Sequence, residues 1–335
     1  MNTQERLDQF IENKGLVFGI AYKMTGSVVE AEDIVQETFL RWEKSKEEKI
    51  RSPKAFLSTV AARLSLDSLR KAKRKRETYI GPWLPEPLAP EPMEEQPDPE
   101  TLDLAFLHLL EKLNPIERAV FLLRESFEMG YDSISKVVGK NQENCRQILK
   151  RAKESLKSDR KKYDAPSEKR KKIFRDFLLA SSKGKPELLV PFLKEEIVLW
   201  SDGGGKVNAA RIPIIGQERA SHFFIRTGSN KLKHTLDFYF GMVNGAETLI
   251  GYYNDQPAYM QSFFIEEDGI SKIYSVLNPD KLKSMENKHK LIEEGLIFPL
   301  ENFLLFPHTY RKKVAKWLNP VAKLVKWAIV RQPRS

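Results

Sequence analysis

The sequence has a single cysteine among its 335 residues, Cys145, which excludes an intramolecular disulfide and favours a reducing, cytoplasmic compartment. Long apolar runs are also missing, since no segment approaches the roughly 20 apolar residues of a transmembrane helix. Residues 1–6 lead directly into a polar amphipathic segment, so no signal peptide is expected. The five histidines show no spacing typical of a metal site, and we expect neither a metal nor another cofactor.

Acidic residues are fewer than basic ones, which gives the chain a net charge of +10 and a pI near 9.3. This balance favours a polyanionic partner or an anionic surface, although many proteins reach such a pI with neither. One segment, residues 77–100, has no Lys or Arg and contains seven prolines and seven acidic residues. That composition cannot form a core, so we expect an extended linker between separate domains.

Residues 27–42 are predicted to form a helix with one buried and one exposed face. Ser27 and Glu30 make the Ser-x-x-Glu pattern of a capping box. Small and apolar residues follow at helical spacing, and an acidic and amide stripe ending in a leucine lies opposite: Asp33, Gln36, Glu37 and Leu40. The stripe suits docking onto a basic partner helix, and the spacing alone fits an ordinary solvated face equally well.

A second long helix is predicted from Ser52-Pro53, a serine cap with proline in the first turn. It ends in a basic run over residues 70–76, in which six of the seven side chains are positive. Cations at a helix C-terminus complement the helix dipole, but six exceed that need. Contacts with phosphate groups are therefore the better explanation of the run.

Residues 101–162 are predicted to contain a helix-turn-helix: a short helix over 132–138, a turn at Gly139 and a longer helix capped by Asn141. The longer helix buries Cys145, which is then a core residue rather than a redox sensor. Its N-terminal residues would lie at base edges in a major groove, and a plain helical hairpin is the alternative. The outer face of the longer helix carries Glu143, Arg146, Gln147 and Lys150.

From residue 163 the pattern changes to α+β. Helices are predicted over 168–182 and 185–193, then a strand over 196–200 that leads into the glycine-rich turn 202–206. Further strands are separated by Asn-Gly, Asn-Asp and Asp-Gly turns and are predicted over 236–243, 248–253, 259–265 and 273–277. We expect a curved antiparallel sheet wrapped on helices.

The helix over 27–42 resembles the polymerase-docking helix of extracytoplasmic-function (ECF) sigma factors, the subunits that direct bacterial RNA polymerase to promoters. The likeness continues through the chain in the order expected for that family. Residues 59–70 resemble its promoter −10 recognition helix, and 79–88 and 143–152 are similar to the subgroup with a fused SnoaL-like, NTF2-type domain. The turns 202–206 (Asp-Gly-Gly-Gly-Lys) and 278–282 (Asn-Pro-Asp-Lys-Leu) match signatures of that domain.

The resemblance implies a multidomain chain: an all-α sigma2 domain (1–76), the linker (77–100), an all-α sigma4 domain (101–162), an α+β SnoaL-like cone domain (163–285) and a basic tail (286–335). The implied partners are promoter DNA and core RNA polymerase, through its clamp coiled coil and flap. The polymerase-binding residues would be Asp33, Gln36, Glu37 and Leu40, and those for the −10 element Arg63, Arg70, Lys71 and Arg74. On the helix-turn-helix, the residues that would contact the −35 element are Arg146, Gln147, Lys150, Arg151 and Lys153.

In sigma factors generally, the linker between these domains threads the active-site and RNA-exit region of polymerase. In the resembling subgroup the fused domain takes a regulatory role, so no separate anti-sigma protein is expected to be obligatory. The signature turns supply the candidate regulatory contacts with the linker or the sigma domains: Asp202, Gly204, Lys206, Asn278, Asp280 and Lys281. Leu64 and Ser65 stand where many members have asparagine, so a promoter sequence is not carried over.

NTF2-type folds also host enzymes and ligand-binding domains, so the third domain has other interpretations. A catalyst would draw its acid or base from Asp202, His222, His234, Asp237 and Tyr252. We expect a regulatory surface rather than an enzyme, and a small ligand stays open. The alternative for the whole chain is a helix-turn-helix regulator with a ligand-sensing domain and no polymerase docking.

Residues 286–335 are basic, with apolar residues at helical spacing over 314–328. Three roles stay open for this tail. It could pack on the preceding domain, which we favour, bind DNA or polymerase, or lie on a membrane surface as a basic amphipathic helix.

Overall fold

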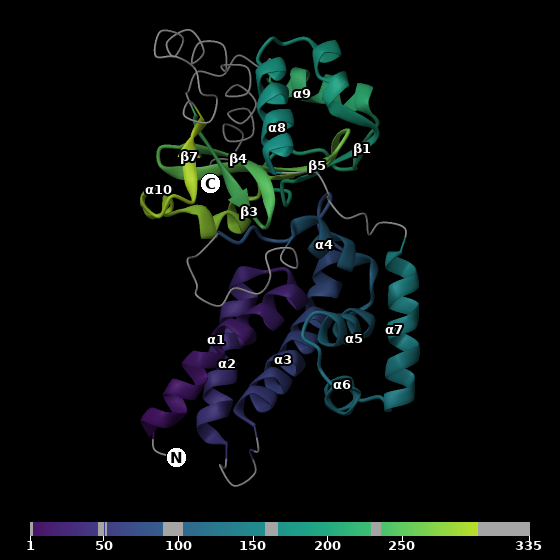
Figure 1. Cartoon of the computed structure of the whole chain (residues 1–335), viewed down its shortest axis with the longest axis vertical. Helices are drawn as coiled ribbons and strands as arrows, with labels where there is room; N and C mark the ends of the chain where they lie inside the picture. The colour runs from purple at the N-terminus through teal and green to yellow at the C-terminus, as the bar shows by residue number, and fades with distance from the viewer. Residues whose placement is uncertain are drawn as a thin grey trace. The chain divides into compact units, whose positions relative to one another are not determined.

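The computed structural model describes residues 3–45, 50, 52–89, 103–157, 167–228 and 236–300. The chain divides into two compact units (Figure 1). Unit 1 comprises the described parts of 1–78 and 91–161, and unit 2 comprises those of 79–90 and of 162 onward. The linker predicted over 77–100 is therefore not one segment, because residues 79–89 belong to the C-terminal unit.

Unit 1 is helical throughout its described residues. Three long helices, α1 (Thr3–Thr25), α2 (Val28–Lys44) and α3 (Pro53–Arg76), pack on one another. These three helices make up the first part of unit 1. The second part, residues 103–157, contains α4 (Leu104–Leu109), the 3-10 turn η3 (Leu110–Lys112), α5 (Pro115–Glu125), α6 (Tyr131–Val138) and α7 (Gln142–Leu156). Both α5 and α6 contact α3, so the two parts form one body. None of the helices in the described ranges is long and apolar enough to cross a membrane.

Local signals set where α2 begins and what it packs against. Ser27 Oγ accepts a hydrogen bond from Glu30 N at 3.2 Å, as the capping pattern predicts. The Glu30 carboxylate accepts a hydrogen bond from Ser68 of α3, which ties the start of α2 to its neighbour. At the other end Trp42 is buried, and its indole donates to Arg6 O at 2.9 Å. These contacts fix which face of α2 is turned to solvent.

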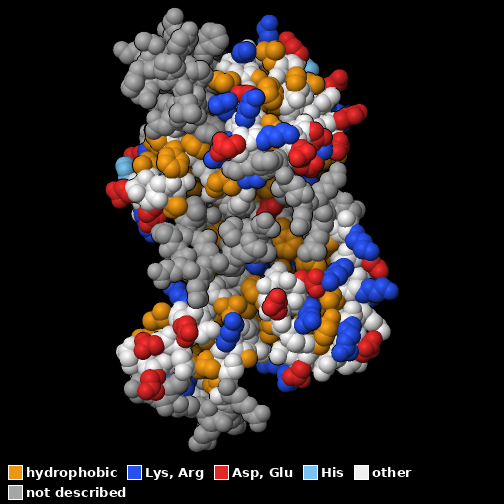
Figure 2. Space-filling view, in the orientation of Figure 1, with side chains coloured by type: hydrophobic (Ala, Val, Ile, Leu, Met, Phe, Trp, Pro, Cys, Tyr) orange, Lys and Arg blue, Asp and Glu red, His pale blue; other side chains and the backbone are white. Residues whose placement is uncertain are grey.

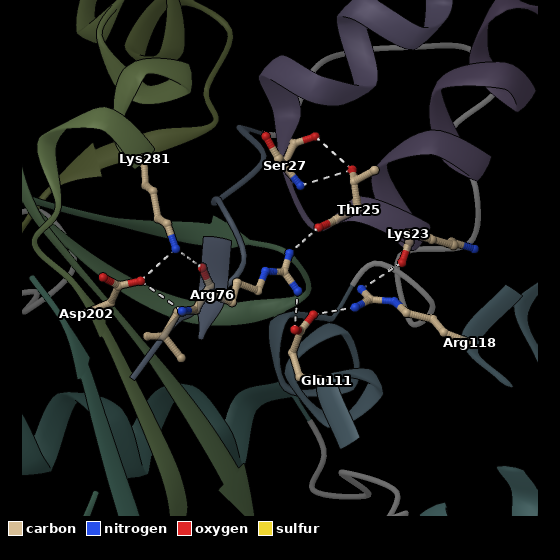
Figure 3. A network of polar contacts seen from close by, with 9 residues as sticks. Lys23, Thr25, Ser27, Arg76, Glu111, Arg118, Asp202 and Lys281 are labelled. Carbon is tan, nitrogen blue, oxygen red and sulfur yellow. Dashed lines mark hydrogen bonds and ion pairs between the residues drawn. The ribbon is translucent and has the colours of Figure 1, made fainter. Parts of the chain in front are cut away.

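A buried charge network joins the two parts of unit 1 (Figure 3). Glu111 of η3 pairs with Arg76, the last residue of α3, and with Arg118 of α5, which is only 1% exposed. Each arginine also donates to a carbonyl at the end of α1, Arg76 to Thr25 O at 2.8 Å and Arg118 to Lys23 O at 3.0 Å. Arg76 belongs to the basic run assigned above to phosphate contacts, and its guanidinium is instead engaged inside the protein.

Unit 2 is an α+β domain with one sheet of strand order β2-β1-β6-β5-β4-β3-β7. The strands are β1 (Leu193–Asp202), β2 (Ile214–Ile215), β3 (Asp237–Val243), β4 (Ala246–Tyr253), β5 (Gln256–Glu266), β6 (Gly269–Val276) and β7 (Ile297–Pro299). Two helices, α8 (Ser167–Ser181) and α9 (Gln217–Gly228), cover one face of the sheet, and α10 (Lys288–Glu293) precedes β7 (Figure 1).

The core of unit 2 lies between the sheet and these two helices. Phe174 and Phe177 of α8 pack against Phe263 of β5, with ring centroids 4.8 and 5.6 Å apart. Phe224 of α9 meets Phe177 edge to face, with centroids 5.3 Å apart. The aromatic residues of the predicted strands therefore serve as the packing surface for the helices.

Three features of unit 2 correct the expectations from sequence. The sheet is mixed rather than wholly antiparallel, because β1 and β6 run parallel. Residues predicted as a helix over 185–193 form two 3-10 turns, 186–188 and 190–192, since Pro191 lacks the N–H that a continuous helix needs. Residues 288–299, predicted as tail, form α10 and β7, and β7 pairs with β3. The sheet therefore extends beyond the predicted boundary at 285; residues 301–335 of the tail lie outside the described residues.

Glu111→Gln should destabilise unit 1. Burial by itself would raise the pKa of Glu111, but Arg118 and Arg76 hold it below the ordinary value. Because the folded-state pKa is lowered, this stabilisation is present above about pH 4.5 and is lost as the pH falls through the folded-state pKa. We expect the substitution to lower the free energy of unfolding by about 3 kcal/mol at pH 7, since the buried Arg118 and the half-buried Arg76 lose their anion.

Urea denaturation from pH 8 down to pH 3, followed through amide exchange in α5, measures this effect. The exposed Glu43 of α2 supplies the control, because Glu43→Gln should change stability little. A Glu111→Gln protein as stable as the control variant would show that the network does not hold the two parts of unit 1 together.

Candidate functional site

The first candidate site is the solvent-facing side of α2. Asp33, Gln36 and Leu40 are exposed there, and Leu40 keeps 45% of its surface accessible. Glu37 is half-buried and pairs with Arg41 at 2.8 Å. The four predicted docking residues thus share one face of the helix, opposite its buried side. An exposed leucine among acidic groups can bind a partner that offers an apolar pocket ringed by cations.

The basic residues of α3 proposed for DNA binding have different surroundings. Arg63 donates to Lys136 O of α6 at 3.0 Å, so another part of unit 1 engages it. Arg70 forms an ion pair within its own helix, with N and O 3.2 Å apart, and Lys71 is exposed. The side chain of Arg74 lies outside the described residues. Arg63, Arg70 and Lys71 are thus all exposed, but the guanidinium of Arg63 is engaged within unit 1 in this conformation.

The predicted helix-turn-helix is formed by α6 and α7. Gly139 lies between them in the left-handed region with φ +67°, and Asn141 caps α7 as expected. Cys145 is buried on the inner side, and burial raises the pKa of its thiol. Lys153 pairs with Glu125 of α5 at 2.7 Å. The other predicted contacts are exposed on the outer face, where basic side chains gather (Figure 2): Arg146, Gln147, Lys150 and Arg151.

The third candidate site lies in unit 2, around the buried carboxylate of Asp202 at the end of β1 (Figure 3). Its Oδ2 accepts hydrogen bonds from Lys281 Nζ at 2.7 Å and from Leu84 N at 2.8 Å. Its Oδ1 accepts from Tyr79 Oη at 2.5 Å and from Gly204 N at 3.0 Å. Two of these donors come from the segment 79–89, so the carboxylate binds that segment to the sheet.

Lys281 completes the site from the turn 278–282. Its side chain is 7% exposed, and its ammonium also donates to Leu84 O. The same ammonium lies over the rings of Trp83 and Tyr79, 4.1 and 5.1 Å from their centroids. Burial raises the pKa of Tyr79, and its hydrogen bond to Asp202 raises it further, so the phenol stays a proton donor. We call residues 79–89, together with the turns 202–206 and 278–282, the linker clasp.

The other predicted regulatory residues connect the turns of the linker clasp. Asn278 Nδ2 donates to Tyr79 Oη at 3.0 Å, and its Oδ1 accepts from Asp280 N at 3.2 Å. Lys206 pairs with Asp280 at 2.5 Å in an exposed ion pair rather than with the linker. Gly204 has φ +59°, and a Cβ there would lie 2.3 Å from Asn278 Nδ2. Both the positive φ and this close approach favour glycine at the position.

The clasp extends further along the linker than the sequence motifs indicate. Leu88 N donates to Asn244 Oδ1 at 2.8 Å, and Pro87 O accepts from Ser284 Oγ at 2.6 Å. Leu84 is fully buried in unit 2. One signal in the sequence distinguishes this half of the linker: residues 79–89 contain one acidic residue, whereas residues 90–100 contain five.

The five residues considered for catalysis have separate environments. The carboxylate of Asp202 is occupied by the linker clasp, and Tyr252 Oη donates to Met285 O at 2.8 Å. His222 and Asp237 are exposed, and His234 lies outside the described residues. Within the described ranges, no cluster of three His, Cys, Asp or Glu side chains could hold a metal ion.

Two protein families match unit 1. Residues 10–75 match sigma-70 region 2, and residues 103–156 match sigma-70 region 4. The first range covers most of α1 to α3, with the acidic face of α2, and the second contains the helix-turn-helix. Together with the helical fold, these matches define a sigma-70-type factor.

Relatives of known type extend the likeness over both units. The chain is 28% identical over 289 residues to the ECF RNA polymerase sigma factor SigJ of Mycobacterium tuberculosis, which covers 82% of this chain and 92% of the relative. It is 27% identical over 277 residues to the probable ECF sigma factor SigI of that organism, covering 81% and 92%. The crystal structure of SigJ has the same fold, with a TM-score of 0.64 at 24% identity over 83% of this chain and 98% of SigJ. The chain belongs to the ECF sigma factors.

Gly204→Ala should loosen the linker clasp. The new Cβ would displace the side chain of Asn278 and break its hydrogen bond to Tyr79. We expect amide exchange of residues 79–84 to become about tenfold faster, as for the loss of one hydrogen bond. Gly184→Ala is the matched control, because Gly184 has a similar φ of +71° and a Cβ there would meet nothing within 4 Å. Equal exchange in the two variants would contradict the steric role of Gly204.

Proposed function

We propose that this chain is an alternative sigma subunit, which binds core RNA polymerase, directs it to promoters and is regulated in cis by its own C-terminal domain. The matches of unit 1 to both sigma-70 regions carry the first part. The hydrogen bonds that hold residues 79–89 in the linker clasp, together with the full burial of Leu84, support the second. In this role polymerase performs the chemistry in the cytoplasm, and the chain itself is not an enzyme.

Polymerase binding is assigned to the exposed face of α2. Its carboxylates and amide suit a basic helical partner such as the clamp coiled coil, and Leu40 supplies an apolar anchor at the end of the stripe. The buried side of α2 and the contact of Glu30 with Ser68 hold this face in a fixed orientation. The face is therefore preorganised for docking.

Leu40→Asp should weaken binding to core polymerase by at least about 30-fold, as expected when an anchor is replaced by a charge. Val29→Asp is the matched control, since Val29 lies on the same helix and is 46% exposed against 45% for Leu40. Binding is measured by titration of labelled full-length protein with core polymerase. Equal loss in both variants would mean that general acidity of α2, rather than the Leu40 face, determines binding.

Promoter recognition is assigned to α3 and α7. On α7, Arg146 and Gln147 are exposed in the N-terminal half, the part of a recognition helix that reaches base edges. An arginine can pair bidentately with guanine and a glutamine with adenine, each pair contributing about 1–3 kcal/mol of discrimination. Lys150 and Arg151 would contact phosphates, which fix the register of the helix without reading sequence.

Regulation is assigned to competition for the linker. In sigma factors the segment between regions 2 and 4 threads through polymerase, and here residues 79–89 lie on unit 2 instead. The same residues cannot occupy both places at once. The linker clasp therefore restrains initiation until it opens, and the restraint needs no separate anti-sigma protein.

Lys281→Met should open the clasp and raise transcription several-fold. The substitution keeps the apolar stem of the side chain but removes the cation that holds Asp202 and Leu84 O. The measurement is run-off transcription by core polymerase with the full-length protein. Lys206→Met is the matched control, since Lys206 forms an exposed pair that contributes at most about 1 kcal/mol.

An output from Lys281→Met equal to or below that of the Lys206→Met control would overturn the restraint and leave the sigma assignment intact. Absence of transcription from wild type and both variants, on promoters taken from the host genome, would instead favour the plain helix-turn-helix regulator.

A further inference from the structure

The guanidinium of Arg146 is restrained in the free protein. Its Cζ lies over the ring of Tyr131, the first residue of α6, 4.9 Å from the centroid. Glu143, one turn earlier on α7, pairs with Arg146 Nη1 at 3.3 Å. The Arg146 side chain nevertheless remains 51% exposed, so these contacts restrain it without covering it.

The Tyr131 ring is itself anchored to the body of unit 1. Arg124 of α5 places its Cζ 5.1 Å from the same ring centroid. Arg124 is half-buried, and its Nη1 donates to Met129 O at 3.1 Å in the connection before α6. The ring therefore joins the half-buried Arg124 of α5 to the outward-facing Arg146 of α7.

The two partners of Arg146 use different parts of its guanidinium. An aromatic ring contacts the face of the group and leaves its N–H edge available. A carboxylate instead occupies the N–H edge, the same edge that donates to O6 and N7 of guanine. In the free protein Glu143 takes one of these donors, Nη1, whereas the ring occupies none of them. Because the ring already restrains the Arg146 side chain in the free protein, this side chain loses less conformational entropy when it binds DNA.

We propose that Tyr131 is a positioning residue for base recognition: it holds Arg146 over its ring so that the guanidinium edge meets a guanine of the −35 element. This inference rests on the proposed function, because it requires that α7 reads promoter DNA. It adds a specificity determinant on α6, a helix whose residues have no assigned contact with DNA.

The test compares Tyr131→Leu, Tyr131→Phe and Arg146→Ala in holoenzyme assembled from the full-length chain and core polymerase. Each holoenzyme selects from a promoter library with a randomised −35 element, and sequencing of bound and input DNA gives the base preference at each position. Arg146→Ala should reduce the preference for guanine at one position by about 5- to 150-fold. Tyr131→Leu should reduce it at that same position by about 2- to 5-fold, the effect of one exposed cation–π contact.

Tyr131→Phe should keep the wild-type preference, because the ring rather than the hydroxyl contacts Arg146. The double variant Tyr131→Leu with Arg146→Ala should match Arg146→Ala alone. If Tyr131→Leu lowers binding equally at every sequence, the residue only supports packing of α6, and the proposal is overturned. Failure of phenylalanine to restore the preference would overturn it as well.

Glu143→Gln provides a second measurement that does not disturb α6. It removes the competing carboxylate and leaves the ring, so the guanine preference should be retained; its loss would show that Glu143 positions Arg146. If wild type selects a motif that Arg146→Ala leaves unchanged, the proposal falls and the sigma function stands. If the wild-type holoenzyme selects no motif at all, both fall.

Discussion

A carboxylate buried as completely as that of Asp202 is stable only when every strong acceptor position faces a donor. The sheet alone supplies too few donors, and the remainder come from Lys281 and from a segment more than a hundred residues away in sequence. The ammonium of Lys281 is in turn balanced by this carboxylate and by two aromatic rings. Each charge is paired with the other, and residues 79–84 supply the remaining hydrogen bonds of both. Release of the linker would therefore leave part of this buried charge cluster without hydrogen-bond partners, which favours the closed clasp.

Unit 1 contains a second ion-pair network, around Glu111, in which the cations outnumber the anions. One carboxylate serves two arginines, and each arginine uses its remaining donors on carbonyls at the end of α1. Because these carbonyls belong to a helix terminus, they lack partners within the helix and accept readily. The network thus uses unsatisfied helix ends to connect parts of the chain that the linker separates. Its stability depends on ionisation of a single side chain.

Periodic signals in the sequence predict the elements well. The face of α2, the turn at Gly139, the buried stripe of α7 and the strands of the meander depend on local spacing and turn chemistry, and the structure has them in the predicted places. What local spacing cannot show is which distant segments meet. The parallel pairing of β1 with β6, the addition of β7 to the sheet and the partition of the linker depend on long-range contacts. The sequence identifies the turns 202–206 and 278–282 as contact sites, but it does not show whether they contact the linker or the sigma domains.

The hydrogen bond from Arg63 to Lys136 O has a consequence for how the protein meets a promoter. It places α3 and the helix-turn-helix within atomic contact. Elements centred 10 and 35 base pairs upstream of a start site lie about 85 Å apart along the axis of B-DNA, at about 3.4 Å per base pair. No rigid body in which these two helices touch can span that interval. Under the proposed assignment of α3 and α7 to these two elements, engagement of both requires the two halves of unit 1 to separate along the DNA.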